Sequence, residues 1–181
     1  MEANGPHEIQ AHFVDMREVA ENLTISSDSN KPWIKTVTLK GFCALHGREH
    51  AMNTVVGTVD CIISGLSCKP FSCARSKRFS QGSNAHKDAD LYQAFLQILR
   101  ALKPKIALVE NVYGLLLPES KQVKQTPLET FLAEVAASCE GYHPVVFLMH
   151  GSTFMILTRR RVYILLIHES AGGARACQSL P

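Results

Sequence analysis

The chain has 181 residues, 46% of them hydrophobic and 19% charged, which is typical of one folded globular domain and excludes a disordered chain. The net charge is only +3, so an affinity for nucleic acid would have to come from a local basic cluster. The first ten residues lack the apolar core of a secretory signal, and no apolar run approaches the ~18 residues of a membrane span. We therefore expect an intracellular protein of the nucleus or cytoplasm, with no membrane partner.

The sequence contains six cysteines, which without a secretory signal are expected to be reduced thiols. A zinc site built from Cys43, His46 and His50 is conceivable, but the chain has no Cys-x-x-Cys pair to support it. We therefore predict no metal.

The N-terminal third of the chain gives the weakest structural signals. Residues 1–8 are expected to be disordered, and 12–16 form a short predicted strand that ends near Asp15. The Asp15 carboxylate would cap a following helix over 17–23. Residues 33–39 read as a strand, whereas 41–53 show no clear period, and the sequence indicates no role for the insertion at 24–58.

The apolar run from Val59 to Ile63 predicts a buried strand, which Ser64 and Gly65 break. Cys68 follows that strand, at the place where open α/β sheets hold ligands, although a cysteine there can also be a small buried hydrophobe. The polar, basic segment 73–87 is either a mobile lid that contacts phosphates or a solvated surface loop.

The second half of the chain alternates between helical and strand patterns. Helical spacing covers 88–103 and stops at Pro104, and a strand follows over 106–109. Thr126, Pro127 and Glu129 have the pattern of a capping box at the start of a helix, which Gly141 ends.

Two further strands are expected over 144–149 and 162–167, and the tail 171–181 is expected to be disordered. The alternation predicts an α/β sandwich with a mostly parallel sheet and helices on both faces. Residues 9–170 would form this one domain.

Three stretches, each attached to a predicted strand, resemble the motifs of the cytosine-C5 methyltransferases in their family order. Gly65 to Ser72 is similar to the Gly-x-Pro-Cys-Gln-x-Phe-Ser loop of that family, and Glu110-Asn111-Val112 is similar to its Glu-Asn-Val. The cluster Arg159 to Arg161 resembles the Arg-x-Arg of its Gln-x-Arg-x-Arg. The resemblance extends over roughly 13–168 and implies a partial S-adenosylmethionine-dependent methyltransferase fold of the Rossmann-like kind.

The resemblance implies transfer of a methyl group from S-adenosylmethionine to C5 of a flipped cytosine in DNA. Cys68 would attack C6 of the base and make C5 enamine-like, while Glu110 would be the acid at N3. Arg159 and Arg161 would hold the base or a phosphate and stabilise the thiolate. The resemblance places the cofactor near Asp15, Met16, Ser67 and Leu91. It places the substrate near Ser72, Arg75, Asn111 and Val112.

Seen alone, each motif also has an ordinary interpretation: a solvated basic turn for the arginines and a strand-end turn for Glu110-Asn111. The chain also departs from the family pattern. It has no Phe-x-Gly-x-Gly loop, and Ser67, Lys69 and Leu157 replace a Pro and two Gln.

We therefore expect the central part of a catalytic domain, without a target-recognition region, that binds S-adenosylmethionine poorly by itself. The alternatives are an RNA cytosine-C5 methyltransferase, or a catalytically dead paralogue that binds nucleic acid or a full-length methyltransferase partner.

Overall fold

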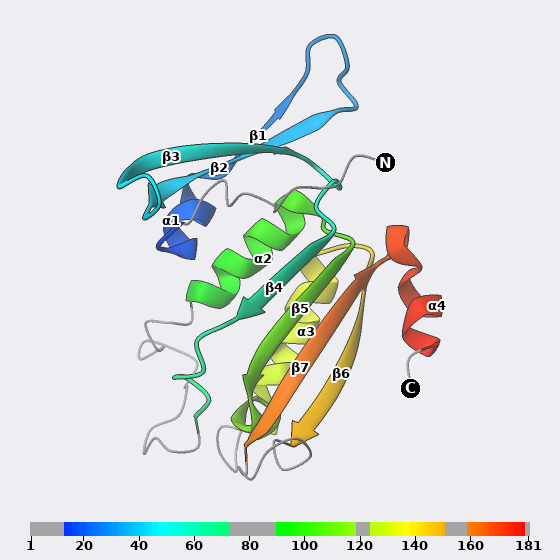
Figure 1. The fold of residues 1–181 in the computed structure, drawn as a ribbon. Helices are drawn as coiled ribbons and strands as arrows, with labels where there is room; N and C mark the ends of the chain where they lie inside the picture. Colours follow the sequence, from blue (N-terminus) through cyan, green and yellow to red (C-terminus); the bar gives the residue numbers. More distant parts are fainter. Residues whose placement is uncertain (1–12, 73–89, 119–123, 151–158, 180–181) are drawn as a thin grey trace, which may run out of the picture.

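The computed structural model describes residues 13–72, 90–118, 124–150 and 159–179, and these form two β-sheets on either side of one helix, α2 (Figure 1). None of the helices in these ranges is long and apolar enough to cross a membrane. The elements are, in chain order, α1 (Met16–Glu21), β1 (Thr24–Ser27), β2 (Lys35–Cys43), β3 (Arg48–Val55), β4 (Cys61–Gly65), α2 (Asp90–Leu102), β5 (Ile106–Val112), η1 (Tyr113–Leu116), α3 (Pro127–Ser138), β6 (Tyr142–His150), β7 (Arg160–His168), η3 (Glu169–Ala171) and α4 (Gly173–Gln178).

The larger sheet has four strands in the order β4-β5-β7-β6, and its strand directions are mixed. β4 and β5 are parallel, whereas β7 is antiparallel to both of its neighbours, β5 and β6. The expectation of a mostly parallel sheet is therefore wrong for these pairings. For β6 and β7 the physical reason is their connection, since a parallel neighbour needs a crossover of a dozen or more residues and only 151–159 separate these two strands.

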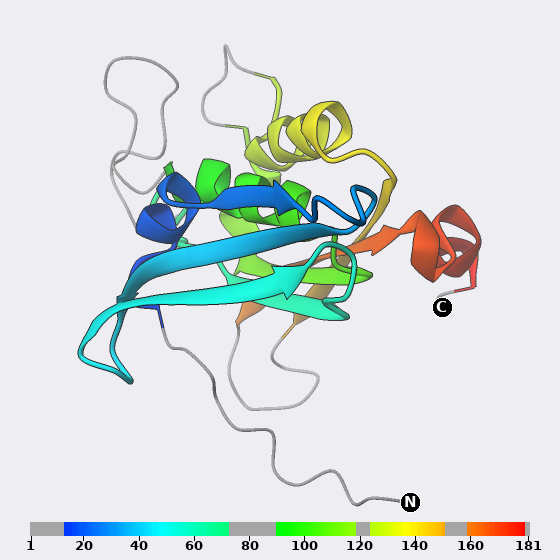
Figure 2. The ribbon, with the colours of Figure 1, turned by 90° about the horizontal axis from the view of Figure 1, so that it is seen from above.

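Helices α2 and α3 cover the same face of this sheet (Figures 1 and 2). Alternate residues of the central strands point into that layer, among them Val109 of β5 and Ile164 of β7, each 1% exposed. The opposite face carries Ile63, which is 77% exposed. The short helix α4 lies at one end of the sheet, beside β6 and β7. The sequence predicted helices on both faces of the sheet. The described helices do not form such layers.

The smaller sheet is an antiparallel meander in the order β1-β2-β3. Its inner face packs Val37 and Leu39 against Val19 of α1 and against Leu102 at the end of α2. The region 41–53, predicted to be irregular, is instead a β-hairpin, with Gly41 opposite His50. Only the inner side of this hairpin is buried, so the polar residues of β3 obscure its alternation.

The two ends of the described chain also differ from expectation. Residues 12–16 were predicted to form a strand, but Phe13 makes only a single bridge to Cys43, and residue 12 lies outside the described ranges. Part of the tail 171–181, predicted to be disordered, forms α4, whose first residue Gly173 is buried. The predicted disordered segment 1–8 also lies outside the described residues.

Candidate active site

Cys68 lies in a loop whose two ends are buried in the core. The loop leaves β4 after Gly65, and Leu66 and Phe71 are each only 5% exposed. Between them, Cys68 and Lys69 are exposed. The backbone N–H of Phe71 donates to the carbonyl of Cys68 over 3.0 Å and closes the turn. Buried anchors on either side therefore present the thiol to solvent.

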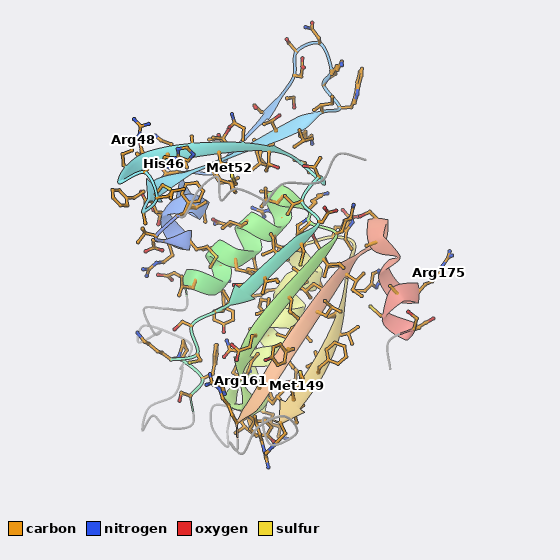
Figure 3. All side chains as sticks on the ribbon, viewed as in Figure 1. His46, Arg48, Met52, Met149, Arg161 and Arg175 are labelled. Atoms are coloured by element: carbon orange, nitrogen blue, oxygen red, sulfur yellow. The ribbon has the colours of Figure 1, made fainter. Side chains whose placement is uncertain are left out.

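Glu110 and Arg161 form an ion pair at the same end of the sheet. Arg161 Nε donates to Glu110 Oε1 over 2.6 Å, and the side chains are 20% and 35% exposed, respectively. Glu110 is opposite Gly65 in the parallel pair, so β5 carries this acid to the point where the Cys68 loop begins. Figure 3 shows Arg161 at the start of β7. Because β7 runs antiparallel to β5, its first residues lie beside the last residues of β5.

The next residue, Asn111, points to the other face of the sheet and is 1% exposed. Its Nδ2 group donates to the carbonyl of Leu66 over 3.3 Å and to the hydroxyl of Tyr92 over 2.5 Å. Its Oδ1 accepts from the backbone N–H of Val112 over 2.8 Å. The Asn111 side chain, predicted to touch substrate, is thus engaged inside the protein and holds the start of the Cys68 loop.

Tyr92 is the site residue that the sequence analysis did not single out. Burial raises the pKa of its hydroxyl above the ordinary value, and the neighbouring Cys68 and Glu110 raise this pKa further, against the hydrogen bond from Asn111. The contacts of Tyr92 with Asn111 and Phe71 place it between β5 and the Cys68 loop. Its sequence signal was only the helical spacing of a core residue, which gives no hint of a hydrogen bond to another element.

The remaining predicted site residues that the structure describes lie in several different elements and loops. Arg159 is exposed immediately before β7, and Arg160 stacks its guanidinium 5.3 Å from the ring centre of Tyr113. Arg75 and the predicted lid 73–87 fall outside the described residues. Four more predicted contacts are half-buried: Ser67, Ser72, Leu91 and Val112.

Asp15 acts as the N-cap of α1, as the capping hypothesis predicted. Its Oδ1 accepts from the backbone N–H of Arg17 over 2.9 Å, and the Arg17 side chain pairs with its Oδ2 over 2.7 Å. The hydrogen bond from the Arg17 side chain is the main cause that lowers the pKa of Asp15. Met16, the first residue of the helix, packs against the core of the larger sheet.

The residues considered for a zinc site form a small contact cluster in the β2–β3 hairpin. Cys43 Sγ lies 3.2 Å from His46 Nδ1, and the rings of His46 and His50 stack with centroids 4.1 Å apart. Cys43 is fully buried. Within the described ranges, no three His, Cys, Asp or Glu side chains are arranged to hold a metal ion.

The fold and site define an α/β chain with an exposed cysteine and a carboxylate–guanidinium pair at one end of a mixed sheet. The model of the family described as C-5 cytosine-specific DNA methylase matches residues 45–175, well over half of the chain. The chain belongs to this C-5 cytosine-specific DNA methylase family.

The matched relatives are much longer than this chain. The Type II methyltransferase M.HgiCII of Herpetosiphon aurantiacus is 26% identical over 114 residues, which are 62% of this chain and 24% of that protein. This chain therefore spans about a quarter of the length of that relative.

Two solved structures are similar in part. A protein from an E. coli prophage, described as a DNA modification methyltransferase, has 21% identity and a TM-score of 0.45, over 62% of this chain and 28% of the other. The Dnmt2 methyltransferase of S. pombe has 23% identity and a TM-score of 0.37, over 60% and 29%.

Proposed function

We propose that this chain supplies the cytosine-reacting half of a DNA cytosine-C5 methyltransferase site, with Cys68 as the nucleophile. The observation that carries the proposal is the Glu110–Arg161 pair, 2.6 Å apart, at the strand end from which the Cys68 loop departs. An exposed thiol, a carboxylate and a guanidinium at one end of the sheet are the groups that this chemistry requires.

The reaction is difficult because C5 of cytosine is a poor nucleophile. In the proposed path the Cys68 thiolate forms a bond to C6, and the displaced ring electrons make C5 nucleophilic. Glu110 would carry a proton on its second oxygen when the base is bound, and donating that proton to N3 offsets the charge that develops there. Once C5 carries the methyl group, water takes the C5 hydrogen as a proton, the C6–Sγ bond breaks to release the Cys68 thiolate, and N3 returns its proton to Glu110, which restores aromaticity.

Arg161 has a positioning task in this scheme. Its Nε holds Oε1 of Glu110, while Oε2 lies on the side of Gly65, 3.9 Å from where a Cβ at that glycine would be. The carboxyl group is therefore fixed in one orientation, with its second oxygen toward the start of the Cys68 loop. A charge-assisted bond of this kind is stronger than one between neutral groups.

Members of this family use S-adenosylmethionine as methyl donor, and the residues described here fit that molecule only poorly. The carboxylate of Asp15, assigned to the adenine side by resemblance, has both oxygens bonded to Arg17. The other three assigned residues lie on separate elements: Met16 on α1, Ser67 in the Cys68 loop and Leu91 on α2. We therefore derive no step through the methyl donor.

The test is covalent capture of a base by the full 181-residue chain. A single-stranded oligonucleotide that contains 5-azacytosine avoids the need for base flipping, and its C6 is more electrophilic because nitrogen replaces C5. Intact-mass spectrometry should find one adduct, and peptide mapping should place it on Cys68. Glu110→Gln should slow capture by about 10²- to 10⁴-fold, the usual contribution of a positioned acid.

The matched control is Cys61→Ala, which removes another exposed thiol at the start of β4 and should leave capture unchanged. Cys68→Ala should abolish it. Absence of any adduct in the unaltered chain, or an adduct that persists in Cys68→Ala, would overturn the proposal.

A further inference from the structure

We propose that Tyr92 is a positioning residue that fixes the Cys68 loop at both ends and holds it in register with Glu110. The effect of this role on methyl transfer rests on the proposed function of Cys68. The positioning of the loop by Tyr92 does not depend on that function. Tyr92 lies in the first turn of α2, on a different element from every proposed catalytic group.

The first end of the loop is held through the hydroxyl of Tyr92. Asn111 Nδ2 has two N–H donors, and one goes to this hydroxyl while the other goes to the carbonyl of Leu66. Leu66 is two residues before Cys68. The hydroxyl therefore fixes the rotation of the amide that holds the loop, because a different amide orientation would break one of the two bonds.

The second end is held through the ring of Tyr92. The Phe71 ring meets it edge to face with centroids 5.3 Å apart, and the Phe131 ring of α3 packs against it at 5.8 Å in the same geometry. Such aromatic pairs are favourable beyond their buried area. Phe71 also closes the turn of the loop through its bond to the Cys68 carbonyl. Tyr92 thus contacts Phe71 directly and holds Leu66 through Asn111, and these two anchors flank the exposed residues Cys68 and Lys69.

The same arrangement couples the loop to the acid. Asn111 follows Glu110 directly in β5, so a bond from its side chain to Leu66 ties the nucleophile's loop to the strand that carries the carboxylate. The ladder between β4 and β5 ends at the pair Gly65–Glu110. Beyond this pair, the bond from Asn111 to the Leu66 carbonyl joins the loop to β5, and Tyr92 orients the amide that makes it.

A buried phenylalanine at position 92 would fill the same core and keep both ring contacts. Removal of the hydroxyl alone therefore tests the positioning role while the packing of the ring stays the same. Loss of the hydroxyl leaves one Asn111 N–H without its partner inside the core, which is costly for a buried donor.

The experiment compares Tyr92→Phe with a matched control, Tyr142→Phe. Both tyrosines are 8% exposed, and Tyr142 donates its hydroxyl proton to the carbonyl of Pro104 over 2.7 Å, on an element away from the loop. Hydrogen–deuterium exchange of amides 66–71 is measured in both variants, together with the rate at which Cys68 captures the 5-azacytosine oligonucleotide.

Tyr92→Phe should accelerate exchange in 66–71 by about two- to tenfold and slow capture by a similar factor, the change expected when one hydrogen bond is lost. Tyr142→Phe should change neither. Exchange in 66–71 that is unaltered in Tyr92→Phe, or accelerated equally in both variants, would overturn the assignment. If the unaltered chain captures no base, the proposed function fails, but exchange still decides whether Tyr92 positions the loop.

Discussion

At the scale of single residues, two neighbours in β5 have separate tasks because a strand points successive side chains to opposite faces. Glu110 meets Arg161 on the exposed side, whereas Asn111 meets Tyr92 and the Leu66 carbonyl in the core. A substitution at one of these positions should therefore affect a different property from a substitution at the other. In the proposed function, Glu110 would take part in the chemistry and Asn111 would hold the loop.

The thiols of Cys68 and Cys139 should differ in their rate of alkylation. Cys139 is 3% exposed, and burial raises the pKa of its thiol, which lowers the fraction of reactive thiolate. Cys68 is exposed beside Lys69 and should be the most reactive of the six thiols. At mildly acidic pH, an alkylating reagent should label Cys139 much more slowly than Cys68, because Cys139 is buried and its raised pKa lowers the fraction of thiolate.

Rates are measured by peptide mapping in the native chain and in single Cys→Ser variants. Cys61, which is exposed on β4 and has no adjacent lysine, serves as the reference for exposure alone. Equal rates for Cys68 and Cys139 would contradict this prediction.

The sequence motifs were sufficient to nominate Cys68, Glu110 and Arg161, because each lies next to a recognisable apolar strand. The motifs could not reveal Tyr92. Its contacts reach Asn111 and Phe71 from another element, and helical spacing reports only that a residue faces the core.

At the scale of elements, α3 begins with a complete capping box. Thr126 Oγ1 accepts from the backbone N–H of Glu129 over 3.2 Å, and Glu129 Oε2 accepts from the backbone N–H of Thr126 over 2.7 Å. Thr126→Ala should lower the free energy of unfolding by about 1 kcal/mol, the usual effect of losing an N-cap side chain. Urea denaturation followed by circular dichroism measures this change.

Thr130→Ala is the matched control on the same helix. Its hydroxyl bonds back to the carbonyl of Thr126, a contact that generally does not stabilise a helix. This substitution should change stability by less than about 0.5 kcal/mol. An equal loss in both variants would mean that the cap contributes nothing specific.

Local signals in the sequence predicted local structure well. Thr126, Pro127 and Glu129 identified the start of α3, and the start agrees with the structure. Strand directions were predicted less well, because pairing depends on residues far apart in the chain. The antiparallel placement of β7 matters for the site, since it brings Arg161 to the end of β5 that carries Glu110.

At the scale of the whole molecule, the larger sheet carries an exposed apolar residue on its edge strand. Ile63 is 77% exposed, and β4 pairs with β5 on one side only among the described strands. Edge strands with apolar surface tend to associate. Ile63→Lys should reduce self-association with little change in stability, because the side chain is already in solvent.

Light scattering across a range of protein concentrations tests this prediction, with thermal melts as the stability check. Leu45→Lys is the control, since Leu45 is 57% exposed but lies in the β2–β3 turn, away from the larger sheet. An unaltered chain that stays monomeric throughout would contradict the prediction.

Helix α2 serves both sheets at once. Phe95 and Leu99 belong to the core of the larger sheet, whereas Ala101 and Leu102 belong to the core of the meander, and Ile62 packs against both. Neither core can lose this helix and keep its buried surface, so the two sheets have no independent melting behaviour. Heating should therefore produce a single cooperative transition. Disturbance of the β1-β2-β3 meander, far from Cys68 along the chain, would then change the population of molecules in which the Cys68 loop is formed.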